Sequence, residues 1–174
     1  MEFQKGKLKE KFQNWGDIYA IKFDIVVNKL PGTITNVFCF TAFPNGDDIK
    51  IHGNRIPALF VKPDGRFHFR TSLNDDANFG FHNETNIDFV IGEIYHVVIK
   101  HLKVGSKYRY KIIINDEVKK DIENHNPRSF SNVHLYTSEP FWDSFTNEFG
   151  KVCNFKVLQD AGEFLSSSLA NYTQ

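Results

Sequence analysis

Several side chains in this sequence have the chemistry that proteins use to bind sugars. Aromatic rings stack on the apolar face of a sugar, and planar polar groups hydrogen-bond to its hydroxyls. We therefore predict a carbohydrate- or protein-recognition surface made of Arg55, His68, Arg70, Asn78, Tyr136 and Trp142. Two of them have a structural alternative. Arg55 precedes Ile-Pro, where it can anchor a loop through a buried carboxylate, and Trp142 is of a type that is mostly buried.

Aspartate pairs on either side of residues 55–73 are the candidates for a metal site. Ca²⁺ takes several oxygen ligands that converge from loops. The two pairs flank one predicted hairpin, so they can meet at one end of it; they are Asp47, Asp48, Asp75 and Asp76. The alternative is that Asp serves only the turns of a loop-rich surface. Calcium is the one cofactor for which the sequence offers ligands.

The sequence contains no catalytic signature. Glycoside hydrolysis requires two carboxylates that face each other across the sugar. The densest acidic group lies in a predicted hairpin and is interpreted as a solvated face; it contains Asp116, Glu117, Asp121 and Glu123. The segment His125-Asn126-Pro127-Arg128 resembles the galectin sugar motif H-x-N-P-R, but one residue is missing between His and Asn, so we interpret it as a turn. We predict that the protein is not an enzyme.

Composition and charge exclude several classes of partner. The 174 residues fit one domain, and the formal net charge of zero gives the whole chain no reason to bind nucleic acid. No run of about 18 apolar residues occurs, so no membrane span is predicted. Cys39 and Cys153 are too few for a disulfide framework. We favour two free thiols over a single bridge between them.

Two N-glycosylation sequons favour a secreted protein. They are Asn83-Glu84-Thr85 and Asn171-Tyr172-Thr173, and such sequons are used in surface loops of secreted proteins. The first residues are polar and lysine-rich, so no signal peptide is visible; a leader replaced by the first Met would explain this. We predict an extracellular location and a glycan or glycoprotein partner. Self-association into a homo-oligomer, through Phe-rich strands and a lysine-bearing edge, is the alternative mode of action.

Short strands separated by turn residues account for most of the chain. Residues 55–73 predict a hairpin, because Phe67 and Phe69 alternate with polar neighbours and Pro63-Asp64-Gly65 supplies a tight turn. Asn115-Asp116 predicts a second, two-residue turn. The expected strands are Tyr19–Val27, Asn36–Phe43, Ala58–Lys62, Phe67–Arg70, Phe79–Phe81, Ile94–Lys100, Tyr108–Ile114, Val118–Ile122, Val133–Thr137 and Val152–Leu158. With almost no helical periodicity, this pattern predicts an all-β, antiparallel two-sheet sandwich or jelly roll.

The two ends of the chain fall outside the main pattern. Residues 1–14 carry lysines at alternate positions, which favours a solvated edge strand or a frayed terminus over a basic arm. The pattern weakens after Gln159, so residues 160–174 are expected to form a short helix or a loose tail. We therefore predict a single sandwich domain over residues 15–159.

A set of short segments carries a resemblance to a known family: Ala20–Ile25, Asn36–Phe38, Asn54–Ala58, Ile91–Val97, Asn126–Phe130 and Tyr136–Trp142. In this order and spacing they resemble secreted invertebrate proteins with a concanavalin A-like lectin/glucanase fold, related in shape to laminin G and pentraxin domains. The similarity spans roughly residues 15 to 158. It implies a jelly roll whose concave sheet carries a ligand. The E-x-D-x-E motif of the glucanases of this fold is absent, which favours a lectin-like module over a glycan-processing enzyme.

Overall fold

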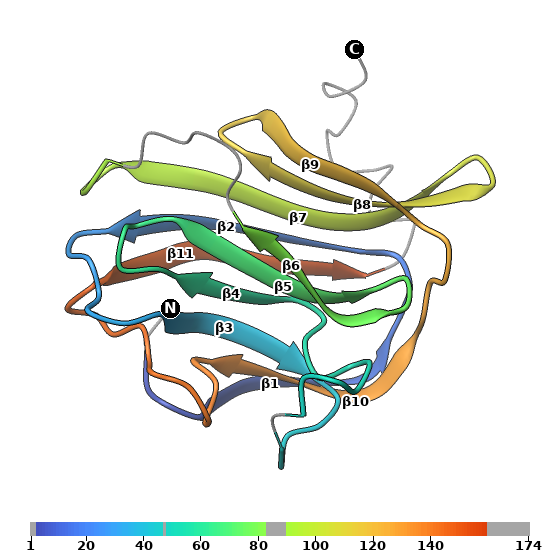
Figure 1. Cartoon of the computed structure of the whole chain (residues 1–174), viewed down its shortest axis with the longest axis horizontal. Coiled ribbons are helices and arrows are strands. Elements are labelled where there is room, and N and C mark those ends of the chain that lie inside the picture. Colours follow the sequence, from blue (N-terminus) through green and yellow to red (C-terminus); the bar gives the residue numbers. More distant parts are fainter. Residues whose placement is uncertain (1–2, 47, 83–89, 160–174) are drawn as a thin grey trace.

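The computed structural model describes residues 3–46, 48–82 and 90–159, which form eleven strands and no helix (Figure 1). The strands belong to two sheets, and every pair of neighbours is antiparallel. The six-stranded sheet contains, in spatial order, β1 (Lys7–Trp15), β10 (Phe130–Thr137), β3 (Thr35–Thr41), β4 (Ala58–Val61), β5 (Phe67–Leu73) and β6 (Asp76–His82). The five-stranded sheet contains β11 (Gly150–Gln159), β2 (Tyr19–Val27), β7 (Ile94–Val104), β8 (Lys107–Ile114) and β9 (Glu117–Asn124).

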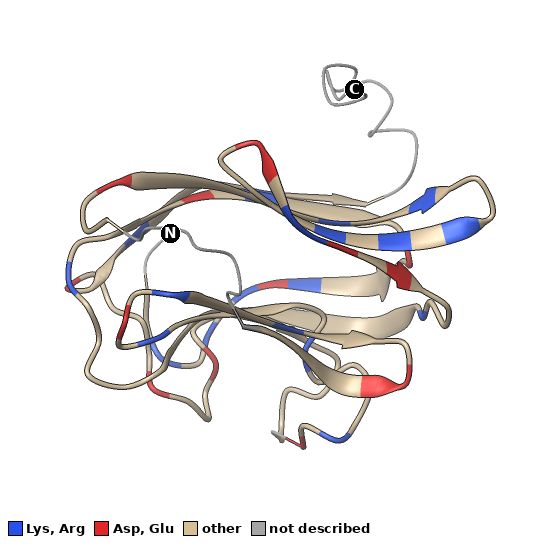
Figure 2. Ribbon diagram, turned by 45° about the horizontal axis from the view of Figure 1, so that its top comes forward, with Lys and Arg blue, Asp and Glu red and all other residues tan. Residues whose placement is uncertain are grey.

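The two sheets lie face to face as two layers (Figure 2), and phenylalanine side chains fill the space between them. Phe67 and Phe69 of β5 are each 1% exposed, so the predicted alternation does direct them into the core. Phe23 of β2 meets Phe38 of β3 edge-on across the interface, with ring centroids 5.2 Å apart. The hydrophobic effect of this aromatic layer therefore holds the two sheets together.

Both predicted hairpin turns are present. Gly65 has a φ of 84° and donates its N–H to the carbonyl oxygen of Lys62, which closes the turn between β4 and β5. Asn115 and Asp116 have φ values of 49° and 66° between β8 and β9. Two consecutive positive φ values are the mark of a type I′ turn, whose twist matches that of the flanking strands.

Several strands are longer than the sequence pattern predicts. β7 continues beyond Lys100 to Val104, and β6 begins at Asp76, which the pattern assigns to a loop. At the N-terminus, Lys7–Trp15 forms the outermost strand of the six-stranded sheet, in agreement with the edge-strand interpretation. Trp15 at its end is 1% exposed. The predicted tail at residues 160–174 lies outside the described residues.

The two cysteines belong to different sheets. Cys39 is in β3 of the six-stranded sheet and is buried, whereas Cys153 is in β11 of the five-stranded sheet and is half-buried. Both are free thiols, as favoured from the sequence. Among the described residues there is no helix long and apolar enough to cross a bilayer.

Candidate functional site

The predicted recognition residues gather on the outer face of the six-stranded sheet. On β5 the core-facing phenylalanines alternate with His68 and Arg70, which must therefore point to the opposite side. The same rule places Asn78 of β6 and Tyr136 of β10 on this side. We call this outer side of the sheet the arginine face. It contains the partly exposed residues Arg70, Asn78, His134 and Trp142 and the buried residues Arg55, Phe60, His68 and Tyr136.

Arg70 lies across β6 in a fixed position. Its Nε donates to Nε2 of His68 at 2.6 Å, and its Nη1 donates to the carbonyl oxygen of Asn78 at 2.8 Å. Gly80 stands directly opposite in the register, and a Cβ there would lie 2.5 Å from Nη1. Partial burial, followed by the nearby Arg55, lowers the pKa of Arg70. The missing side chain at Gly80 thus creates the space in which the guanidinium lies.

Arg55 is a structural anchor rather than a surface group. Its side chain is 4% exposed, and its Nη2 lies 3.9 Å from Oε2 of Glu139, which is 2% exposed. Nη1 donates to Oδ1 of Asn78 at 3.0 Å. The guanidinium carbon also lies 5.2 Å from the ring of Phe60 and 5.3 Å from that of Trp142. The sequence offered two roles for Arg55, a ligand-binding group or a loop anchor that pairs with a buried carboxylate. The structure shows the anchor.

Trp142 covers part of the arginine face and keeps partial exposure. It meets Phe60 edge-on at a centroid distance of 5.5 Å and packs against a small apolar cluster with Cys39 and Ala58. This cluster lies on the outer side of β3 and β4, separate from the core between the sheets. The indole of Trp142 is therefore partly buried, and the rest of its surface is exposed to solvent.

A buried asparagine attaches the loop that carries Trp142 to β3. Oδ1 of Asn36, which is 0% exposed, accepts the backbone N–H of Glu139 at 2.7 Å. The backbone N–H of Asn36 donates to the carbonyl oxygen of Asp143, and its carbonyl oxygen accepts from the N–H of Phe145. These bonds fix the loop on both sides of Trp142. Nothing in the sequence indicated this role, beyond the presence of one amide at the start of an otherwise apolar strand.

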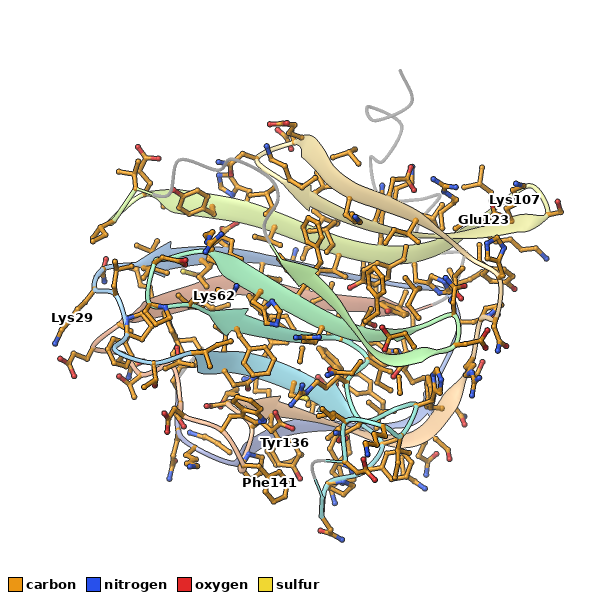
Figure 3. The ribbon with its side chains drawn as sticks, in the orientation of Figure 1. Lys29, Lys62, Lys107, Glu123, Tyr136 and Phe141 are labelled. Carbon is orange, nitrogen blue, oxygen red and sulfur yellow. The ribbon has the colours of Figure 1, made fainter. Side chains whose placement is uncertain are left out.

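Tyr136 lies at the β10 side of the arginine face (Figure 3). Its ring stacks on that of His134, with centroids 6.1 Å apart and planes at 15°. Burial, followed by the neighbouring Cys39, raises the pKa of Tyr136. Nδ1 of His134 is buried and has no hydrogen-bond partner among the described residues. His134 was not predicted, although it is two residues from Tyr136 and therefore shares its side of the strand.

The predicted metal ligands do not form a cluster among the described residues. Oδ1 of Asp48 accepts the N–H of Lys50, Oδ1 of Asp76 accepts the N–H of Asn78, and Oδ1 of Asp75 accepts from the amide of Asn126. The first two are local bonds of the kind that the alternative interpretation expects, whereas the third joins two segments that are far apart in the sequence. No group of at least three His, Cys, Asp or Glu residues that could hold a metal occurs within the described residues. Asp47 and the two predicted glycosylation sites, Asn83 and Asn171, lie outside them.

Comparison with known proteins identifies relatives in structure rather than in sequence. No protein-family model and no curated protein matches the sequence. The structure is similar to a heptameric SAP-like pentraxin from Limulus polyphemus, with a TM-score of 0.54 and 16% identity over 90% of this chain and 72% of the pentraxin. It is also similar to an alginate lyase from Pseudomonas aeruginosa (TM-score 0.56, 11% identity, 84% of this chain and 68% of the lyase). A third similar structure is the receptor-binding domain of botulinum neurotoxin D (TM-score 0.55, 10% identity, 88% of this chain and 36% of that one).

Likeness at these levels of identity shows the fold and leaves the ligand open, because this fold carries unrelated functions. The neighbours include an enzyme as well as proteins that are not named as enzymes. They confirm the predicted fold class. The chain is an all-β, antiparallel two-sheet jelly-roll sandwich.

Proposed function

We propose that this protein is a non-catalytic, lectin-like recognition module that binds a glycan across the arginine face. The observation that carries the proposal is the convergence of a partly exposed indole and a positionally fixed guanidinium on one side of a sheet. Trp142 offers a ring for the apolar face of a sugar, and Arg70 offers donors for its hydroxyls. Both keep partial exposure, whereas Arg55 is closed off by its own contacts.

Arg70 has a donor left for a ligand. A guanidinium has five N–H groups in a rigid fork. Nε bonds to His68 and Nη1 bonds to Asn78, while Nη2 has no hydrogen-bond partner among the described residues. Because the fork is already held in place, a sugar hydroxyl or carboxylate that meets Nη2 costs little additional side-chain ordering.

The carboxylate chemistry of the arginine face supports binding rather than hydrolysis. Two opposed carboxylates are needed to protonate the leaving group and to attack the sugar. Glu139, which pairs with Arg55 of this face, is 2% exposed. Its carboxylate is therefore engaged in the scaffold and does not face an incoming ligand.

The extracellular location in this proposal rests on the two sequons at Asn83 and Asn171. Proteins with a similar sandwich also support the proposal that this fold carries a ligand-binding site. One of them acts on alginate, a polysaccharide, and another is a receptor-binding domain. These likenesses show the fold, and we propose the lectin-like role because of Arg70 and Trp142.

A glycan array probed with the purified protein, with Ca²⁺ and with a chelator, tests the proposal. For the glycan that binds best, Arg70→Gln should weaken binding about tenfold or more, since a hydrogen bond to a charged group contributes roughly 1.5–3 kcal/mol. Trp142→Ala should have an effect of similar size. Phe141→Ala is the matched control, because Phe141 is the adjacent residue, is aromatic and is 49% exposed (Figure 3).

The outcomes separate three functions. Binding that depends on Arg70 and Trp142 but not on Phe141 supports glycan recognition at the arginine face. Release of reducing ends from the bound glycan would instead identify an enzyme. If no glycan binds and light scattering shows concentration-dependent association, the protein works through self-association and the proposal is wrong.

A further inference from the structure

The outer side of the five-stranded sheet places like charges directly opposite each other. Lys22 of β2 stands opposite Lys156 of β11, and Lys100 of β7 stands opposite Lys111 of β8. Lys22 is opposite Val98, two residues from Lys100, so the two pairs are diagonal neighbours. We call this surface the lysine face. Figure 2 shows both basic and acidic segments in the layer to which it belongs.

This arrangement opposes folding rather than supporting it. Like charges that face each other across neighbouring strands destabilise a sheet. Lys111 is compensated by Asp121, whose Oδ2 lies 3.0 Å from its Nζ. Within the described part of the chain, Lys22, Lys100 and Lys156 form no such salt bridge. Burial, and then repulsion from Lys111 and Lys22, lowers the pKa of Lys100.

The nearby carboxylate does not neutralise these ammonium groups. Oδ1 of Asp24 lies 2.7 Å from Nδ1 of His96, and Oδ2 of Asp24 accepts from the amide of Asn154. Burial acts to raise the pKa of Asp24, but the bonds from Asn154 and His96 outweigh it and lower that pKa. Asp24 is thus engaged with its own partners. Within the described part of the chain it forms no ion pair with Lys22, Lys100 or Lys156.

The lysines surround a hollow rather than a flat surface. The hollow has a volume of about 410 Å³ and is lined by Lys22, Lys100 and Lys156, by His96, Val98 and Asn154, and by the two carboxylates Asp24 and Asp116. Its ring-bearing neighbour Phe23 is 2% exposed and points into the core. The site therefore offers three cations beside two carboxylates, together with an amide and an aliphatic surface. Among the described residues, no exposed Phe, Tyr or Trp ring on which nucleic-acid bases could stack lines it.

We propose that the lysine face binds an anionic polysaccharide, with carboxylate or sulfate groups seated among Lys22, Lys100 and Lys156. These lysines come from β11, β2 and β7, which are consecutive strands. Neighbouring strands lie about 4.8 Å apart, so a chain that crosses them meets ammonium groups at regular intervals. An extended polymer with a repeating negative charge fits this spacing, and Val98 accommodates the apolar face of a sugar between the charges.

Dextran sulfate is the probe. Uncharged dextran, which has the same polysaccharide backbone without the sulfate groups, is the control. Titration calorimetry at low and at physiological salt should show binding of dextran sulfate alone, weakened by salt. The double variant Lys22→Gln/Lys156→Gln should bind at least roughly tenfold more weakly. Lys9→Gln/Lys11→Gln removes the same charge from exposed positions on β1 of the other sheet and should leave binding within about twofold.

A second measurement separates loss of the site from loss of the fold. Because Lys22 and Lys156 repel each other, the double variant should have a higher Tm than the wild type in the absence of ligand. Weaker binding with a raised Tm supports the proposal.

Several outcomes would overturn the proposal. They are equal losses in both double variants, binding of uncharged dextran, and lysine-dependent binding only to phosphatidylserine vesicles or single-stranded DNA. The Trp142→Ala variant should bind dextran sulfate normally, so failure of the arginine-face proposal and failure of this one are distinguishable.

Discussion

The buried pair of Arg55 and Glu139 should make Arg55→Met strongly destabilising. The charged atoms lie 3.9 Å apart, and both side chains are under 5% exposed. At an effective dielectric constant of 20, this separation corresponds to an attraction of about 4 kcal/mol. Removal of the cation leaves a carboxylate buried without that attraction. We therefore expect the free energy of unfolding to fall by about 3–5 kcal/mol.

Removal of both charges should cost less than removal of one. In the double variant Arg55→Met/Glu139→Gln no unpaired charge remains, and methionine keeps an apolar contact with the rings of Phe60 and Trp142. We expect this variant to lose about 2 kcal/mol or less relative to the wild type. The difference between the double variant and the sum of the single variants then measures the coupling between the two residues.

Urea unfolding at pH 7, followed by tryptophan fluorescence and far-ultraviolet circular dichroism, provides the measurement. Arg66→Met is the control, since Arg66 pairs with Asp64 at an exposed position in the hairpin turn and its loss should change little. A loss below about 1 kcal/mol for Arg55→Met would refute the reasoning. So would a double variant that is as unstable as the sum of its parts, because Arg55 would then be held by something other than Glu139.

Other parts of the structure lead to further expectations. Gly150→Ala should lower the free energy of unfolding in urea by about 3 kcal/mol or more, because its Cβ would lie 2.0 Å from the carbonyl oxygen of Val26. Gly80→Ala should displace the Arg70 guanidinium. In a binding assay it should weaken binding of the array-selected glycan as much as Arg70→Gln does, with little change in Tm. Burial lowers the pKa of His101 below 6.5, so below about pH 6.5 the unfolded chain binds a proton that the folded chain does not. Urea titrations should then show stability falling from pH 7 to pH 5, by about 1.4 kcal/mol per unit of pKa difference, and His101→Phe should remove the effect.

Period-two alternation made most of the fold predictable. Phe67 and Phe69 could be assigned to the core from their spacing alone, and a turn with Asn115-Asp116 has few conformations open to it. Strand ends were less predictable, because they depend on the partner strand. His101 and Lys103 interrupt an apolar pattern, yet they pair with Tyr110 and Tyr108 of β8, and this cross-strand contact extends β7 to Val104.

The side of the sheet on which the arginine-face residues lie was predictable from the sequence, but the contacts among these residues were not. Alternation on β5 assigns His68 and Arg70 to the outer side, and the sequence context of Arg55 raised a buried carboxylate partner. The sequence could not show which carboxylate is the partner, because Glu139 is brought close to Arg55 only when Asn36 fixes the loop after β10 onto β3. Contacts between residues so distant in sequence leave no trace in the local pattern.

The lysine face shows why a charged residue on an amphipathic strand can be misjudged from one sequence. Lys22, Lys100 and Lys156 each alternate with apolar residues, and each alone is an ordinary solvated side chain. Only the register places Lys22 against Lys156 and sets Lys100 diagonally beside them. The two faces then differ in the kind of recognition they favour. Arg70 is a planar fork fixed by its neighbours and suits one orientation of one ligand, whereas flexible ammonium groups attract any polymer with sufficient negative charge. Specificity is therefore expected from the arginine face, and salt-sensitive attachment from the lysine face.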